Sequence, residues 1–423
     1  MRPYLLCLCL CLSLLAQAQT PIPPPPVPAI DSPDDDVLNV VLVGAATFND
    51  ANIGLTDSLH LLSFNPRTRH VALIGLPRDL YVYVPHVGTM AKLNQAYTLG
   101  AGSIGGASAL KQTLLYNLGV HVDYYARLNF NGFRRLIAQL GGVTLSVDCA
   151  IQDWRLKSPE LDVNDPENWE MFTLENGVHE MDADLALWYV RSRRTTLETD
   201  RGRRQHDLLR AIWRKLREQD VLTNLPALWE TWTRYVETDI TLNDALTWLP
   251  SFLQLETHRI RYETFTLNRE VTNAYTPDND RRFIFVPQHD AIASLLRAAL
   301  FPSEQELSER APLVGVVNVT GVAGYARVAA ERLELEGFRT VILSERASPR
   351  QWNLIIDYTG QDKGNPIDRL RRALATTVEG VRNEPTALRE VDYKVYLGTN
   401  YPYYACTRPI LPPSTPTPPA PDG

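Results

Sequence analysis

Apolar runs and helical patterns alternate along the first two thirds of the chain. Residues 37–44 form a near-continuous apolar run, which is typical of a strand buried on both faces. Residues 59–64 and 71–76 predict two further strands that are joined by a hairpin turn. Residues 107–118 carry apolar side chains at helical spacing, and we expect this helix to end at Gly119, since glycine readily adopts the left-handed turn found there.

A second helix is predicted over residues 131–140, with Asn131 as its N-terminal cap and Gly141-Gly142 as its end. Residues 143–147 alternate in the manner of a strand, and residues 205–253 have a mostly helical pattern. Because strands and helices interleave, the predicted fold class is α/β, with a mixed central β-sheet flanked by helices.

The last third of the chain predicts a second, smaller α/β domain. Its amphipathic helix spans residues 324–336. Its strands are predicted at residues 313–319, 340–343, 354–357 and 393–397. This domain carries no obvious set of catalytic residues, so the candidate chemistry lies in the larger domain.

Proline-rich segments mark the predicted domain boundaries. Residues 19–36 and 401–423 are rich in proline, which favours extended polyproline and does not suit a packed core. We therefore predict a linker over 19–36, a large domain over 37–305, a small domain over 311–400 and a proline-rich tail over 401–423.

The first 18 residues have the features of an export signal: Arg2, a short apolar run and the small-x-small cleavage site Ala16-Gln17-Ala18. The alternatives are an uncleaved membrane anchor and a buried helix. After cleavage the chain would keep only Cys149 and Cys406, which leaves room for a single disulfide in an oxidising compartment. The sequence therefore predicts a secreted or extracytoplasmic protein of the cell envelope.

Composition excludes several classes of protein. With 44% apolar and 22% charged residues, the 423-residue chain can build packed cores. Its formal charge is −7, and becomes −8 when Arg2 is removed, which argues against a general nucleic-acid binder. No apolar run reaches the roughly 18 residues of a spanning helix, so a multi-pass membrane protein is excluded. The eight histidines lack the spacing of a zinc site.

Arginines are concentrated in one stretch, with seven of them against three acidic residues between positions 191 and 210. The strand-like pattern of residues 189–193 would place Arg191 and Arg193 on one face. A helix that begins near residue 200 would place three more side chains on one face: Arg201, Arg204 and Gln205. Guanidinium groups that converge repel one another unless an anion lies between them, and phosphate fits their forks. The alternative is a solvated basic helix with salt bridges to its own acids.

Two further candidates lie near strand ends. Leu76-Pro77-Arg78-Asp79 ends a predicted buried strand, and strand ends are where ligands bind in α/β sheets. The alternative is a turn in which Arg78 and Asp79 merely pair with each other. Asp57 lies just before the predicted strand over residues 59–64 and is a candidate oxygen ligand for a hard cation.

Taken in order, these residues resemble the LytR-CpsA-Psr family, extracytoplasmic transferases that attach glycopolymers to the cell wall. The matching stretches are Thr56-Asp57-Ser58, Ser63-Phe64-Asn65-Pro66, Leu76-Pro77-Arg78-Asp79, residues 92–97 (KLNQAY), Leu140-Gly141-Gly142-Val143, residues 182–193 (DADLALWYVRSR) and residues 200–205 (DRGRRQ). The resemblance covers about residues 37–300. Residues 317–324, with Gly337-Phe338, resemble the LytR-type C-terminal domain that often follows.

The resemblance implies a polyprenyl-pyrophosphate-linked glycan as donor and a peptidoglycan or other cell-wall hydroxyl as acceptor. The implied reaction is a phosphotransfer, with pyrophosphatase as a side activity, at a membrane surface reached through the lipid substrate. It implies that the pyrophosphate is bound by Arg78, Arg191, Arg193, Arg201 and Gln205. Arg204 lies in the same motif, and Asp79 would orient an arginine or assist deprotonation. Asp57 matches one of two aspartates that bind Mg²⁺ in the family.

The chain departs from the family pattern at two positions. Ala46 stands where the second metal-binding aspartate is usual, and Leu55 stands where an arginine is common. The alternative function is therefore a non-catalytic protein of the same fold that binds polyprenyl pyrophosphate or glycan. A DNA-binding transcriptional regulator follows only from older family names, and the export signal and acidic charge argue against it.

Overall fold

The computed structural model describes residues 23–30, 37–48, 53–158, 160–194, 198–218, 228–230, 232–303, 306, 311–361 and 364–401. The predicted signal segment and Cys406 lie outside these residues, whereas Cys149 is disulfide-bonded. Residues 23–30 belong to the predicted linker and lie against the large domain, where Ile30 packs on the core and its N–H donates to the Gly119 carbonyl at 2.8 Å. Within the described residues, no helix is long and apolar enough to cross a membrane.

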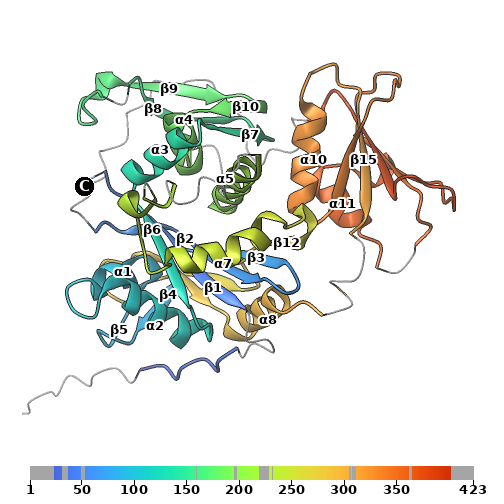
Figure 1. Cartoon of the computed structure of the whole chain (residues 1–423). Coiled ribbons are helices and arrows are strands. Elements are labelled where there is room, and N and C mark those ends of the chain that lie inside the picture. The colour runs from blue at the N-terminus through green and yellow to red at the C-terminus, as the bar shows by residue number, and fades with distance from the viewer. Residues whose placement is uncertain are drawn as a thin grey trace, which may run out of the picture.

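The large domain is built on a six-stranded sheet with the order β11-β6-β1-β2-β3-β12 (Figure 1). Its strands are β1 (Leu38–Ala45), β2 (Thr56–Asn65), β3 (His70–Gly75), β6 (Tyr124–Leu128), β11 (Val236–Thr238) and β12 (Ile260–Thr264). β2 runs antiparallel to both of its neighbours, β1 and β3, while β6 pairs in parallel with β1 and β12 pairs in parallel with β3. The sheet is thus mixed, which confirms the predicted fold class, and the predicted hairpin of β2 and β3 is present.

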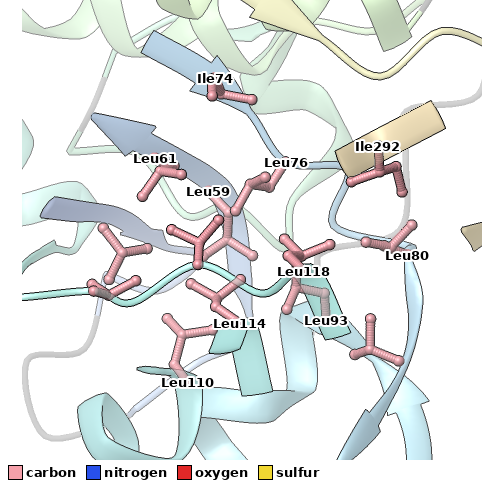
Figure 2. Packing of buried hydrophobic residues seen from close by; sticks show 14 of the residues in the cluster. Leu59, Leu61, Ile74, Leu76, Leu80, Leu93, Leu110, Leu114, Leu118 and Ile292 are labelled. Atoms are coloured by element: carbon pink, nitrogen blue, oxygen red, sulfur yellow. The ribbon is translucent and has the colours of Figure 1, made fainter. Parts of the chain in front are cut away.

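Helices cover both faces of this sheet. Successive side chains of a strand point to opposite faces, and apolar side chains on both faces of β2 are buried. Leu59 and Leu61 of β2 face the core shared with α1 (Leu93–Gly100), α2 (Gly106–Leu118) and α8 (His289–Leu300). Figure 2 shows Leu110, Leu114 and Leu118 of α2 pointing into this core. Phe64 of β2 packs on the other face with α5 (Glu198–Glu218) and α7 (Leu242–Leu253). As predicted, α2 ends at Gly119, whose φ of 71° is left-handed.

A third layer lies above α5 (Figure 1) and holds two antiparallel strand pairs, one of them a hairpin nested within the other pair, and two helices. Its elements are α3 (Phe130–Gln139), β7 (Val143–Val147), β8 (Ile151–Leu156), β9 (Trp169–Leu174), β10 (Gly177–Met181) and α4 (Ala183–Arg191), with a short 3-10 helix, η1 (Pro166–Asn168). The predicted N-cap of α3 is wrong by two residues. Asn129, and not Asn131, has extended backbone, and its side chain accepts from the Gly132 N–H. Asn131 already lies in the first turn.

The predicted strand over 189–193 is wrong, since α4 continues to Arg191. Asp182 caps the N-terminus of this helix by accepting from the Leu185 N–H at 2.8 Å. Ala186, Tyr189 and Val190 are buried at helical spacing, which no strand would allow. The region 205–253 contains α5 and α7, as predicted, but also the short strand β11.

The small domain is the predicted second α/β unit. Its five-stranded sheet has the order β16-β15-β19-β17-β18 and packs against two helices. The elements are β15 (Leu313–Asn318), α10 (Tyr325–Leu335), β16 (Arg339–Leu343), β17 (Leu354–Asp357), α11 (Ile367–Ala373), η3 (Val378–Gly380), β18 (Val381–Asn383) and β19 (Tyr393–Leu397). The large domain is completed by the hairpins β4 (Tyr81–Val84)–β5 (Thr89–Lys92) and β13 (Val271–Tyr275)–β14 (Phe283–Pro287), and by η2 (Thr257–Arg259).

Candidate active site

The site begins at an irregularity between β1 and β2. Gly44 pairs with Ser58 but Ala45 pairs with Thr56, so Asp57 is the additional residue of a β-bulge. A bulge interrupts the regular alternation of a strand and redirects its side chain. Asp57 therefore points toward the arginine-rich segments that lie above the end of the sheet.

Two arginines from distant parts of the chain bind the Asp57 carboxylate. Arg78 follows the end of β3 and approaches Oδ1 through its Nη1 at 2.5 Å. Arg193 follows the end of α4 and approaches Oδ2 through its Nη2 at 3.3 Å. The backbone of Arg193 is held by Asp153 of β8, whose carboxylate accepts its N–H at 2.8 Å. The carboxylate of Asp57 is thus a bridge between the sheet and the third layer.

Asp79 orients the neighbouring cations. Its Oδ2 lies 3.3 Å from the Nε of Arg78, and its Oδ1 lies 2.7 Å from the Nζ of Lys92. The Asp79 carbonyl accepts from the Phe285 N–H at 2.9 Å, which holds the turn in place. These contacts are those of an orienting residue. The sequence assigned no role to Lys92, although it opens one of the family-like stretches.

Helix α5 contributes Arg201 and Gln205. The Arg201 side chain is only 4% exposed, and its charge acts on both Asp57 and His60. The Oε1 of Gln205 accepts from the hydroxyl of Ser58 at 3.2 Å and lies 3.1 Å from the Nε2 of His60. These two side chains hold the amide of Gln205 beside the bulge.

His60 is a site residue that the motif search missed. Burial, opposed by its contact with Gln205, lowers its pKa to about 4, so the imidazole is neutral near pH 7. The signal was present in the alternation of β2: His60 shares a face with Ser58, opposite to Leu59 and Leu61, which fill the core. A polar residue on that face must lie against α5.

Arg191 and Arg204 have other principal contacts. The guanidinium of Arg204 donates to the Ser192 carbonyl and lies 5.6 Å from the centre of the Tyr189 ring, so it supports the end of α4. The guanidinium of Arg191 lies 4.0 Å from the centre of the Phe130 ring. The structure thus brings Arg78, Arg193 and Arg201 to Asp57, and places Arg191 and Arg204 around the end of α4.

Around Asp57 and Asp79, the described cationic side chains outnumber the carboxylates. Burial, the largest single effect, raises the pKa of Asp57, but the guanidinium groups of Arg78, Arg193 and Arg201 together lower it below its ordinary value. Asp57 is therefore ionised near neutral pH. In the part of the chain that the structure describes, the carboxylates of Asp57 and Asp79 are surrounded by these three arginines and Lys92. The arrangement suits a further anion, and guanidinium forks suit phosphate oxygens in particular.

The described residues do not fit a protein-held metal ion. Both oxygens of Asp57 contact guanidinium groups, and no group of three His, Cys, Asp or Glu side chains able to hold a metal is found in the described part of the chain. Ala46 and Leu55, where the chain departs from the family pattern, are hydrogen-bonded neighbours, with the Ala46 N–H 2.9 Å from the Leu55 carbonyl. The sequence offers one substitute for the missing carboxylate, Asp50 in the intervening loop, and it lies outside the described residues.

Comparisons of the sequence and of the fold with known proteins lead to the same family. The LytR_cpsA_psr family matches residues 16–290. A polyisoprenyl-teichoic acid–peptidoglycan teichoic acid transferase TagU of Oceanobacillus iheyensis is 28% identical over 222 residues, 51% of this chain and 63% of the relative. The TagU of Halalkalibacterium halodurans is 26% identical over 264 residues, 62% of this chain and 78% of the relative. The crystal structure of Bacillus subtilis TagV shares the fold with a TM-score of 0.51 and 20% identity, covering 63% of this chain and 98% of TagV.

Proposed function

Because the chain belongs to the LytR-CpsA-Psr family, we propose that it is an extracytoplasmic phosphotransferase acting on a polyprenyl-pyrophosphate-linked glycan. The observation that carries this proposal is the convergence of Arg78, Arg193 and Arg201 on one carboxylate. These arginines come from three separate segments, and the resulting excess of positive charge has the chemistry of a pyrophosphate site. The names of the TagU relatives support a lipid-linked polymer as donor and peptidoglycan as acceptor.

In the proposed reaction, a hydroxyl oxygen of the cell-wall acceptor attacks the phosphorus that carries the glycan. The bond from this phosphorus to the bridging oxygen breaks, and polyprenyl phosphate leaves with the electron pair. Arg78, Arg193 and Arg201 neutralise the charge that develops on the phosphate oxygens, which is the main requirement of phosphoryl transfer. Water in place of the acceptor would give the pyrophosphatase side activity. Asp79 orients Arg78, and we keep it as the candidate that receives the hydroxyl proton.

The lipid part of the donor would bring the protein to the outer surface of a membrane. The predicted export signal and the acidic charge support this location and argue against nucleic acid as a partner. A second function is favoured by two observations: Ala46 stands where a metal-binding carboxylate is usual in the family, and both oxygens of Asp57 contact arginines. A protein of this kind would bind polyprenyl pyrophosphate without turning it over.

Turnover separates the two functions. We would measure cleavage of a polyprenyl pyrophosphate by the purified chain, with and without magnesium, beside the variant Arg193→Ala. The transferase proposal expects phosphate release that falls at least about tenfold in the variant, since one charge-assisted contact to the phosphates is lost. Tight binding without release would favour the non-catalytic protein. Absence of both binding and release would refute the assignment of this site.

Adding the missing carboxylate tests the magnesium expectation. Ala46 lies beside the bulge that carries Asp57, so Ala46→Asp should create a two-carboxylate site and lower the magnesium concentration for half-maximal binding or activity about tenfold. Ala46→Asn has the same size without the charge and serves as the matched control. Equal magnesium dependence in the two variants would mean that Ala46 does not occupy the position of a metal ligand.

A further inference from the structure

The small domain contacts the helix that carries Arg201 and Gln205. Helix α10 of the small domain lies beside α5 (Figure 1), and the two are joined by hydrogen bonds and ion pairs. Val178 of β10 packs against the core of the small domain, so the contact also includes the third layer. None of the contacts of α10 reaches the phosphate-binding side chains directly in the part of the chain that the structure describes.

A buried ion network forms this contact. The Arg210 side chain is 1% exposed, and its Nη1 donates to the Glu331 carbonyl at 2.9 Å and lies 3.4 Å from the Glu334 carboxylate. The Nη2 of Arg210 lies 3.6 Å from the Glu331 carboxylate and 3.3 Å from Asp207. The Nη1 of Arg214 lies 2.7 Å from the other oxygen of Glu331. Two glutamates of α10 thus hold two arginines of α5.

The network fixes the orientation of α5 because charges that are buried require their partners. Removal of one partner from a buried ion pair leaves an uncompensated charge, at a cost of several kcal/mol. Arg201 and Arg210 are nine residues apart, which is about 2.5 turns of an α-helix, so they lie on opposite faces. The same spacing separates Gln205 from Arg214. One face of α5 is therefore directed to Asp57, and the opposite face is directed to Glu331.

A second contact lies nearer to the site. Asp148, which directly follows β7, lies 3.0 Å from the Nη1 of Arg203 on α5 and 3.9 Å from the Nε of Arg332 on α10. Arg203 is two residues from Arg201. The small domain therefore acts on α5 at both the Arg203 and the Arg210 positions, and resists both rotation and tilting of the helix.

We propose that the small domain is a positioning element of the pyrophosphate site, and that Glu331 and Glu334 are positioning residues that act through Arg210 and Arg214. They hold α5 in the rotation that presents Arg201 and Gln205 to the bound phosphates. This inference rests on the proposed function. It assigns to the small domain a role in substrate affinity, although this domain supplies no phosphate ligand.

The test compares binding of inorganic pyrophosphate by the full chain and by the double variant Glu331→Gln/Glu334→Gln. We expect the affinity to fall about tenfold and amide hydrogen exchange in the first two turns of α5 to accelerate, at a temperature where both proteins are folded. The matched control is Glu345→Gln, which removes a charge that pairs with Lys394 inside the small domain, and it should leave both quantities unchanged.

The outcomes are distinguishable. Equal affinity in the wild-type chain and the double variant would overturn the positioning role and leave the proposed function standing. Absence of pyrophosphate binding by the wild-type chain would overturn both. Where the double variant does not fold, Arg214→Gln is the substitute, since its side chain is 25% exposed and it removes a single pair to Glu331. The same loss of affinity, with circular dichroism unchanged, is expected there.

Discussion

Replacing Arg201 by lysine should lower the affinity for polyprenyl pyrophosphate about 100-fold, or ~2.7 kcal/mol. Lysine keeps the positive charge, so the change tests geometry rather than charge. The guanidinium can donate two parallel hydrogen bonds to phosphate oxygens, whereas an ammonium acts as a point charge on a flexible stem. Arg201 is buried beside Asp57, where water cannot replace the lost contact. The measurement is the dissociation constant by calorimetry.

The same helix offers a control for this substitution. Arg217 lies in the last turn of α5, where its guanidinium stacks on Trp213 at 4.8 Å from the ring centre. Arg217→Lys should therefore bind pyrophosphate as the wild-type chain does. If Arg201→Lys also keeps wild-type affinity, with folding verified by circular dichroism, Arg201 does not contact the phosphates and the assignment of the α5 face is wrong.

Acidification from pH 7 to pH 4 should destabilise the large domain, and His60 alone should account for about 3 kcal/mol of the loss. Burial lowers the pKa of His60 from 6.5 to about 4, and it lowers the pKa of His206 well below its ordinary value. Below about pH 6.5 these two imidazoles therefore bind protons in the unfolded chain but stay neutral in the folded chain. Stability is fully present above that pH and is lost as the pH falls toward 4.

Asp207 acts in the opposite direction. Burial raises its pKa to about 6, so its contribution is present below about pH 4 and is lost as the pH rises through 6. It offsets part of the histidine effect in the same interval. Because Asp207 contributes equally in both proteins, the wild-type chain should lose about 3 kcal/mol more stability than His60→Gln between pH 7 and pH 4.

Urea unfolding, followed by fluorescence at several pH values, measures this difference. His121→Gln is the matched control, because the His121 side chain is exposed at the edge of the domain. It should follow the wild-type curve throughout. A His60→Gln curve that is parallel to the wild-type curve would show that His60 takes up its proton in the folded protein as readily as in the unfolded one.

The spacing of apolar residues predicted those strands and helices in which one regular set of side chains is buried. The continuous run of β1, the hairpin of β2 and β3, and the amphipathic helix α2 were all predicted because burial requires one periodicity along each of them. The same reasoning failed over residues 189–193, where only two alternating arginines suggested a strand. The cap at Asp182 and the buried residues Ala186 and Leu187 favour a helix there, and these signals lie upstream of the misread segment.

The site was predicted as a set of residue types rather than as an arrangement. The order of the arginine motifs was sufficient to indicate a phosphate-binding family, and the comparisons confirm the family. Spacing alone could not show that Arg78 and Arg193 bind Asp57 while Arg204 turns to Ser192. Arg78 and Arg193 are more than 100 residues apart, and local periodicity holds no information on which distant segments meet.

The sequence by itself determined the α/β class and the family, because the first follows from short-range periodicity and the second from the order of short motifs. Only the tertiary structure decided which arginines contact the Asp57 carboxylate and why His60 is neutral near pH 7. It also decided that Glu331 of the small domain contacts the face of α5 opposite to Asp57. The physical reason is the same for all three: burial and ion pairing depend on what packs against a side chain, and the partners come from elements that are distant in the chain.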